Sequence, residues 1–188
     1  SSVVASGKAG RIEGHPGDLV FQYYVREKDT YPELQRLIER GLGDGPGVYF
    51  DIGANIGLTL VPVARLGGVV CYGFEPEPEN FALLEANIRA NVPDADVRLF
   101  NLALATERAP LEFELNEDNR GDHRVRGDSL IEKEKFGESG RRTITVEGAP
   151  LDQVIDAEGL AGKCVIKIDT QGSEVNVFRG GEKVFQRA

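Results

Sequence analysis

The stretch Val48–Gly57, with the sequence VYFDIGANIG, constrains the fold more than any other part of the chain. Its apolar start is typical of a buried strand, and this run stops at an acid, Asp51, before a glycine-spaced turn. Gly53 allows a sharp exit from the strand, and Gly57 lets a following helix, over about residues 58–66, pack close to the sheet. The stretch therefore predicts a strand, a tight turn and a helix, with bare backbone against which a ligand can lie.

A second apolar run, Val69–Phe74, ends at Glu75. An acid at the end of this strand can accept hydrogen bonds from both ribose hydroxyls of a nucleoside. A dinucleotide site needs the pattern G-x-G-x-x-G, whereas this turn reads G-x-N-x-G behind Asp51, whose charge would repel a pyrophosphate. The acid suits S-adenosylmethionine instead, because this molecule carries a sulfonium and an ammonium group beside its adenosine. An ordinary α/β turn is the alternative, since Asp and Gly are common at strand ends.

Four blocks of sequence occur in the order seen in the FkbM family of S-adenosylmethionine-dependent methyltransferases, which the chain resembles. They are DIGANIG at Asp51–Gly57, FEPEPENFALLEANIRAN at Phe74–Asn91, NLALA at Asn101–Ala105 and IKIDTQGSE at Ile166–Glu174. The resemblance runs from about Asp18 to the last residue. It implies S-adenosylmethionine as the cofactor and an α/β fold with a doubly wound, Rossmann-like methyltransferase sheet.

The resemblance also implies which residues surround the cofactor. Tyr31 corresponds to the segment that lies over the cofactor in the family, and the loop that begins at Asn101 corresponds to the segment beside the adenine. A ring packed at a helix start and a plain strand-to-loop turn are the respective alternatives. The expected cofactor-binding residues are Tyr31, Asp51, Gly53, Ala54, Asn55, Gly57, Glu75, Pro76, Asn101, Leu102, Ala103 and Asp169.

Two side chains are candidate catalytic residues on the acceptor side. Asp169 ends an apolar run, Cys164–Ile168, and is expected at the carboxyl end of a central strand, where α/β sheets bind ligands. His123 lies in a long polar stretch, residues 116–142, and could act as a general base because imidazole titrates near neutral pH. A loop histidine without a chemical role is the alternative. The family consensus reads I-D-x-E-G-x-E, and Gln171 replaces its first Glu, which removes one carboxylate from this side.

Three segments are expected along the chain. Residues 1–14 are small and polar and are expected to be frayed or a tag remnant. Residues 15–47 are expected to form an N-terminal flap, with a strand over Leu19–Val25 and a helix over Tyr31–Arg40. Residues 48–188 are expected to form a class I methyltransferase domain with a β-hairpin and loop insertion, and the C-terminal strands of the family's sheet are expected outside this sequence. Further expected elements are helices over residues 79–91 and 151–157 and strands over residues 97–100, 111–115 and 143–146.

Composition and charge narrow the possible functions. The net charge of −9 and the pI near 4.8 disfavour a nucleic-acid partner, which would need clustered Lys and Arg. No apolar run approaches the roughly 20 residues that span a bilayer, and the N-terminus lacks a signal-peptide pattern, so we expect a cytoplasmic protein without a membrane partner. We expect Cys71 and Cys164 to be buried thiols, and we expect no metal site because the His and Cys residues lack zinc-like spacing.

These observations favour an O-methyltransferase that acts on a hydroxyl of a sugar, a polyketide or another small metabolite. No N/D-P-P-Y/F string follows the fourth strand, as it does in many N-methyltransferases, and the resemblance points to sugar or polyketide hydroxyls. One alternative is a non-catalytic cofactor-binding or interaction domain. The other is an NAD(P)-dependent oxidoreductase, although the turn lacks the G-x-G-x-x-G spacing. The sequence leaves the acceptor and the oligomeric state open.

Overall fold

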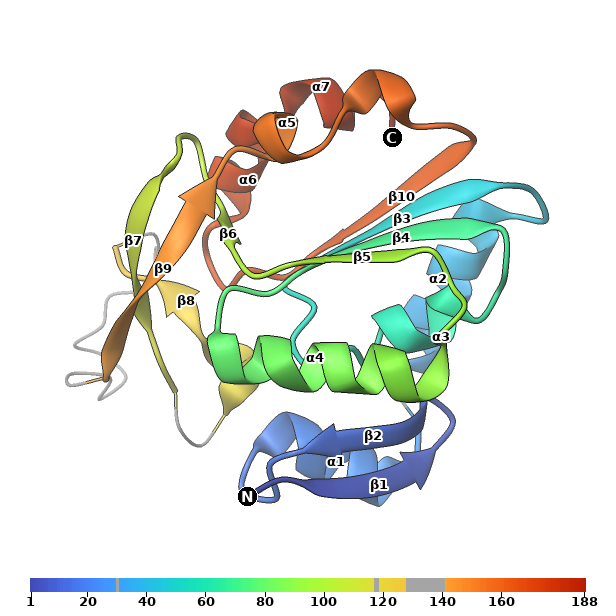
Figure 1. Cartoon of the computed structure of the whole chain (residues 1–188), viewed down its shortest axis with the longest axis vertical. Helices are drawn as coiled ribbons and strands as arrows, with labels where there is room; N and C mark the ends of the chain where they lie inside the picture. Colours follow the sequence, from blue (N-terminus) through green and yellow to red (C-terminus); the bar gives the residue numbers. More distant parts are fainter. Residues whose placement is uncertain (30, 117–118, 128–140) are drawn as a thin grey trace.

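A parallel sheet of four strands forms the centre of the molecule (Figure 1). Its strands, in spatial order, are β10 (Lys163–Ile168), β3 (Gly47–Ile52), β4 (Val69–Phe74) and β5 (Val97–Phe100). The computed structural model describes residues 1–29, 31–116, 119–127 and 141–188. The chain winds from β3 through β4 to β5 and then returns on the other side of β3 as β10, so the order reverses between β3 and β10. Sheets of this kind bind ligands at such a switch point, and the arrangement confirms the doubly wound α/β class.

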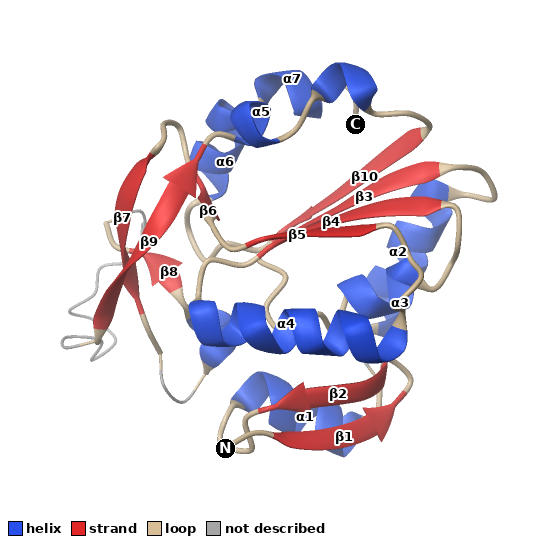
Figure 2. Ribbon diagram, in the orientation of Figure 1, coloured by secondary structure: helices blue, strands red, loops and turns tan. Residues whose placement is uncertain are grey.

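Helices cover both faces of the central sheet (Figure 2). The helices on one face are α2 (Pro32–Leu42), α3 (Leu60–Ala64) and α4 (Pro78–Asn91), and those on the other are α5 (Leu151–Val154), α6 (Glu174–Gly180) and α7 (Glu182–Phe185). Tyr49 belongs to the apolar core on the first face, while its neighbour Phe50 belongs to the core on the second. Every residue of β3 is buried, which explains why the strands read as near-continuous apolar runs.

A second sheet stands beside the carboxyl ends of the central strands (Figure 1). Its strands, in spatial order, are β6 (Ala103–Leu104), β9 (Thr143–Ala149), β7 (Ala109–Glu114) and β8 (Arg124–Val125). A short 3-10 helix, η1 (Arg120–Asp122), precedes β8. Phe113 and Val146 contribute to an apolar cluster of this sheet. The sheet includes the predicted hairpin insertion, of which residues 117–118 and 128–140 lie outside the described residues.

The N-terminal residues form a hairpin, so the prediction that residues 1–14 are frayed is wrong for residues 3–14. Strands β1 (Val3–Gly7) and β2 (Gly10–Gly14) pair antiparallel. Two asparagines one turn apart on α4 supply hydrogen bonds to the free edge of β2. Asn87 accepts from the Glu13 N–H at 2.7 Å and donates to the Glu13 carbonyl at 3.0 Å, and Asn91 does the same for Arg11 at 2.9 and 2.8 Å. The two amide side chains thus act as a neighbouring strand would.

The predicted strand over Leu19–Val25 is also wrong, because this segment forms helix α1 (Leu19–Glu27). The carboxylate of Asp18 caps its first turn and accepts from the N–H groups of Val20 and Phe21. Phe21 and Tyr24 are three residues apart, as a helical face requires, and both are buried. The aromatic residues of this run favour a strand, but the N-cap at Asp18 and the i, i+3 spacing of Phe21 and Tyr24 favour the helix that forms.

The other predicted elements are confirmed, but α3 and α5 are both shorter than expected. The helix predicted over residues 151–157 ends at Val154, and residues 157–159 form a separate 3-10 helix, η3. Cys71 is buried and Cys164 is half-buried, and both are free thiols. Within the described residues, the helices are too short or too polar for any of them to cross a bilayer.

Candidate active site

A cavity of about 430 Å³ lies at the carboxyl ends of β3, β4 and β10. Its size falls within the range of small-molecule sites. The second sheet and η1 contribute one wall, and Tyr31 and Val20 contribute another. Ten predicted site residues line the cavity, namely Tyr31, Gly53, Ala54, Asn55, Glu75, Pro76, Leu102, Ala103, His123 and Asp169. Asp51, Gly57 and Asn101 are not among the residues that line it.

In the glycine turn at the end of β3, the backbone N–H groups are all hydrogen-bonded within the protein. Gly53 has a φ of +79°, and a Cβ there would lie 2.0 Å from the Asp169 carbonyl oxygen, so only glycine fits. Asn55 is left-handed with a φ of 50°. The N–H groups from residue 53 to residue 57 all donate within the protein, to Phe74 O (twice), Glu75 Oε2, Asn55 Oδ1 and Ala54 O. The turn therefore has no spare N–H group to offer a pyrophosphate, which a dinucleotide site would require.

Asp51 lies behind the turn rather than against a ligand. Its carboxylate is fully buried, accepts a hydrogen bond from the Thr59 hydroxyl and pairs with the Lys167 ammonium at 3.0 Å. The expectation that its charge faces the ligand is therefore corrected, because Lys167 neutralises it from the opposite residue of β10. Sequence reasoning missed Lys167, although a lysine inside an apolar strand needs a counter-ion, and Asp51 occupies the same level of the next strand.

Glu75 presents a buried carboxylate to the cavity. Its Oε2 accepts from the Asn55 N–H at 2.9 Å and its Oε1 from the Glu77 N–H at 3.0 Å. Burial raises the pKa of Glu75 to about 7, although these two hydrogen bonds act against the shift. Asn101 supports this loop from outside the cavity, since its Nδ2 donates to the carbonyls of Glu75 and Pro76 at 2.8 and 3.0 Å. The strand end that is predicted to bind a nucleoside is thus a loop already ordered by hydrogen bonds, and the carboxyl group of Glu75 lines the cavity there.

Asp169 is exposed at the cavity, and the loop after it is held independently of its carboxylate. Gln171, which has a left-handed φ of 56°, donates from Nε2 to Asp169 Oδ1 at 2.7 Å. Glu174 accepts hydrogen bonds from Thr170 N at 3.1 Å and from Gly172 N at 3.1 and 3.2 Å. Glu174 therefore stabilises the turn, while Gln171 orients the acid.

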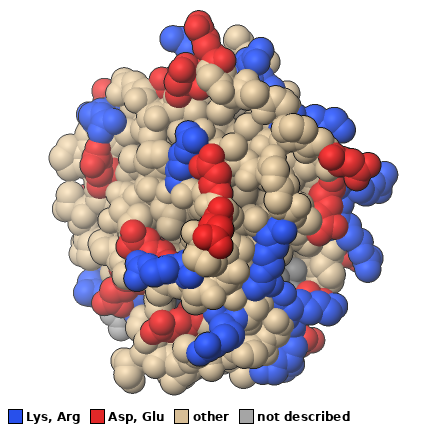
Figure 3. Space-filling model, turned by 45° about the vertical axis from the view of Figure 1, so that its right-hand side comes forward, with Lys and Arg blue, Asp and Glu red and all other residues tan. Residues whose placement is uncertain are grey.

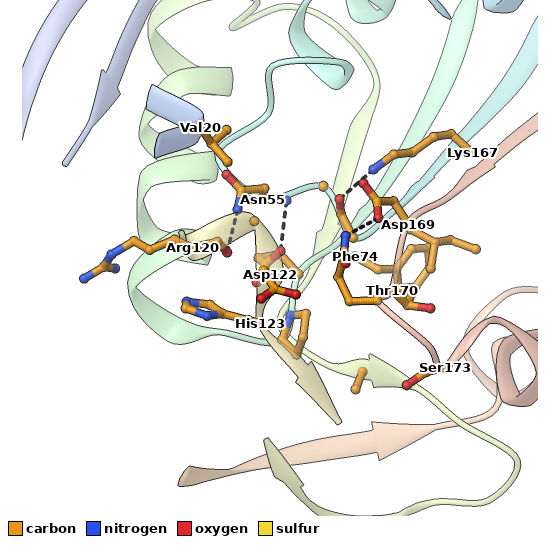
Figure 4. Close-up of a pocket in the computed structure, with 18 of the residues that line it drawn as sticks. Val20, Asn55, Phe74, Arg120, Asp122, His123, Lys167, Asp169, Thr170 and Ser173 are labelled. Atoms are coloured by element: carbon orange, nitrogen blue, oxygen red, sulfur yellow. Dashed lines mark hydrogen bonds between the residues drawn. The ribbon is translucent and has the colours of Figure 1, made fainter. Parts of the chain in front are cut away.

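His123 lies on the opposite side of the cavity from Asp169 (Figure 4). Its Nδ1 accepts from the Asn116 N–H at 2.9 Å, so the ring proton belongs on Nε2 in the neutral form. Burial, followed by the charges of Arg120 and Arg141, lowers the pKa of His123 to about 4. A neutral ring with its only lone pair already occupied is suited to donate a hydrogen bond, not to abstract a proton. The general-base role of His123 stays a prediction, and this geometry does not favour it.

Arg120 joins η1 to three other segments around the cavity mouth. Its carbonyl accepts from Asn55 Nδ2 at 3.1 Å (Figure 4). It also accepts from Asn80 Nδ2 at 3.4 Å. Its N–H donates to Asp18 Oδ1 at 2.9 Å, and its guanidinium donates to Glu79 at 2.8 Å. These contacts close the insertion over the glycine turn and the start of α4. The sequence did not single out Arg120, because its partners are distant in the chain.

Tyr31 borders the cavity from the first residue before α2. Its backbone is left-handed with a φ of 43°, and its ring stacks on Tyr23 with 5.8 Å between centroids. Burial, and then the charge of Asp169, raises the pKa of Tyr31. Tyr31 and Asp169 both line the cavity, and the contact of Tyr31 with the cofactor stays a prediction.

Comparison with known proteins agrees with this geometry. The model of a family described as "Methyltransferase FkbM domain" matches residues 51–188. No curated protein matches the chain. Solved structures resemble it in part. The S-adenosylmethionine-dependent methyltransferase from Agrobacterium tumefaciens is 14% identical with a TM-score of 0.42, over 54% of this chain and 32% of that one.

Two further structures show a similar partial likeness. P. horikoshii TYW2, solved in complex with MeSAdo, is 19% identical with a TM-score of 0.38, over 54% of this chain and 36% of that one. The Pyrococcus abyssi tRNA (uracil-54, C5)-methyltransferase, solved with S-adenosyl-L-homocysteine, is 14% identical with a TM-score of 0.36, over 53% of this chain and 23% of that one. The chain thus spans about a third or less of the length of these proteins. The family match over most of the chain, with the site that it contains, shows that the chain belongs to the FkbM methyltransferase family, whose cofactor is S-adenosylmethionine.

Proposed function

We propose that the protein transfers the methyl group of S-adenosylmethionine to a hydroxyl group of a small metabolite. The observation that carries this proposal is the cavity at the switch point of the sheet, with Glu75 at one strand end and Asp169 exposed at another. The cofactor supplies an electrophilic methyl group on a sulfonium. The protein's task is to bind and orient the two molecules, to exclude water and to receive one proton.

The residues of the cavity fit the parts of this cofactor. The Glu75 carboxylate is the acceptor for the ribose hydroxyls, since it has lone pairs beyond the two that its backbone contacts use. Leu102 and Ala103, at the end of the adjacent strand, offer a narrow apolar surface for the adenine. The amino-acid end then lies over Gly53, near Asp169. This placement follows the strand order β5, β4, β3, β10 across the cavity.

We assign proton acceptance to Asp169 in preference to His123. Asp169 is exposed to the cavity, and Gln171 holds one of its oxygens while the other has no hydrogen-bond partner among the described residues. A carboxylate oriented in this way can accept the hydrogen of the attacking hydroxyl. His123 would donate from Nε2 to the acceptor and so fix its orientation.

The walls around this position favour a small acceptor. Leu104, Phe113 and Val125 are buried apolar residues that line the cavity, beside the polar Ser173 and Thr170. On the face shown in Figure 3, the basic and acidic side chains are interspersed and the described residues form no broad basic patch. This mixed charge, together with the net charge of −9, supports a small-molecule acceptor over a phosphate backbone.

Two measurements test the proposal. Titration calorimetry should show binding of S-adenosylhomocysteine and no binding of NAD, because the turn's N–H groups are all engaged. Transfer of a labelled methyl group from S-adenosylmethionine should then be screened against hydroxyl-bearing sugars and polyketides, with the matching amines as controls. NAD binding without a response to S-adenosylhomocysteine would contradict the cofactor assignment, and transfer to amines alone would contradict the hydroxyl assignment.

A further inference from the structure

Among the described residues that line the cavity, Lys167 and Arg120 carry the cationic side chains. The guanidinium of Arg120 is engaged by Glu79 at 2.8 Å and lies 3.7 Å from Glu77. Lys167 has a different environment, because its Nζ donates to the Gly53 carbonyl at 2.7 Å (Figure 4). The same Nζ pairs with Asp51 at 3.0 Å. An ammonium group has three N–H donors, so one remains after these two contacts.

The cofactor brings two positive groups and one negative group, the α-carboxylate. Asp51, Glu75 and Asp169 provide negative charge around Lys167 and cannot themselves receive the negative group. The carboxylate needs a donor at the same end of the cavity. The N–H groups of the glycine turn cannot serve, because each already donates within the protein. Lys167 lines the cavity beneath Gly53, where the amino-acid end of the cofactor is placed.

We propose that Lys167 binds the α-carboxylate of the cofactor, which deepens the proposed function and rests on its placement of the cofactor. The buried Asp51 then has a clear role. It holds the lysine in position and keeps it charged, with the Thr59 hydroxyl bonded to the other carboxylate oxygen. Burial acts to lower the pKa of Lys167, but the charges of Asp51 and Asp169 outweigh it and the pKa is raised. The site therefore offers a fixed cation at all working pH values.

Ligands that lack parts of the amino-acid end test this inference directly. S-adenosylhomocysteine has the carboxylate, 5′-(3-aminopropyl)thioadenosine lacks it, and 5′-methylthioadenosine lacks the whole amino-acid end. Calorimetry on the parent protein should show that loss of the carboxylate alone weakens binding about 10- to 100-fold, the range for a hydrogen bond to a charged group. Equal affinity for the first two ligands would overturn the proposal, whatever the behaviour of any variant.

The matching substitution is Lys167→Met in an Asp51→Asn background, because Lys167→Met alone would leave a buried charge unpaired. Relative to the parent protein, this double variant should lose about 10- to 100-fold in affinity for S-adenosylhomocysteine and less than about threefold for 5′-methylthioadenosine. Arg120→Met is the control, as it removes the other cation of the cavity and should not discriminate between ligands with and without the carboxylate. Circular dichroism would verify that each variant is folded.

The outcomes separate this inference from the proposed function. Equal losses for both ligands in the double variant would mean that Lys167 supports only the fold, and the inference would fail while the cofactor assignment survives. A parent protein that binds none of the three adenosyl ligands would overturn the proposed function and, with it, the role of Lys167. A selective loss for the carboxylate-bearing ligand would support both.

Discussion

Replacing Glu75 with glutamine keeps the volume of the side chain but removes the charge that the ribose hydroxyls would meet. Glu75 is 5% exposed, and its pKa is raised to about 7 by burial. The free protein therefore holds this proton more tightly than an exposed glutamate does. If the cofactor binds only the carboxylate form, binding must release the proton below pH 7, and affinity must fall as the pH falls.

The expected change in cofactor affinity follows from the raised pKa of Glu75. Below a pKa of about 7, the apparent affinity for S-adenosylhomocysteine should drop about tenfold for each pH unit, so binding at pH 6 should be about tenfold weaker than at pH 8. At pH 8, Glu75→Gln should cost roughly 1.5–3 kcal/mol, or about 10- to 100-fold in affinity. The variant should also lose this pH dependence.

Titration calorimetry at several pH values, in buffers of different ionisation enthalpy, would measure both the affinity and the protons released. Glu77→Gln is a matched control, because Glu77 is equally buried but caps the N-terminus of α4 instead of lining the cavity. It should lower stability and keep most of the pH dependence of binding, because burial raises the pKa of Glu75 more than the charge of Glu77 does. Equal affinity of the parent protein at pH 6 and pH 8, or unchanged affinity in Glu75→Gln, would refute the assignment of Glu75 to the ribose.

Three further outcomes are expected. With a known acceptor, Asp169→Asn should lower turnover by about 10²–10⁴-fold and should leave the dissociation constant of the cofactor within a few fold. Unchanged turnover would contradict the role of Asp169 as proton acceptor. His123→Asn, which retains a donor, should keep more turnover than His123→Ala, whereas equal loss in both would point to a base after all. Asn87→Ala should lower the free energy of unfolding by roughly 2–3 kcal/mol in denaturant titrations, because one buried and two part-buried hydrogen bonds disappear. A change within about 0.5 kcal/mol would argue against its role in docking the hairpin.

The central sheet could be predicted from sequence because each parallel strand is buried on both faces. The run Val69–Phe74, for example, has the same bounds as β4. The hairpin of residues 3–14 could not be predicted in this way. Its strands are short and polar, and their edge is satisfied by Asn87 and Asn91, which are distant in sequence. Local pattern carries no information about such partners.

The candidate site, too, could be predicted from the sequence only in part. The cavity includes the predicted Gly53, Glu75 and Asp169, because strand ends and glycine turns have local signatures. Lys167 lies inside an apolar run that predicts only a buried strand. Its pairing with Asp51 depends on the register between β10 and β3, which the sequence does not show. The protonation of His123 also depends on a tertiary contact, the Asn116 N–H, that its loop position does not reveal.

The contacts of Arg120 bear on how acceptor specificity can change in this architecture. The insertion that carries Phe113 and Val125 on the acceptor wall is bonded, through the Arg120 carbonyl, to Asn55 of the glycine turn. If an insertion taken from another protein placed no carbonyl group at the position of the Arg120 carbonyl, the Asn55 side-chain amide would lose its hydrogen-bond acceptor. The glycine turn would then be less ordered. Engineering of a new acceptor preference should therefore exchange residues within the wall and keep η1 and its contacts to Asp18, Asn55 and Asn80 intact.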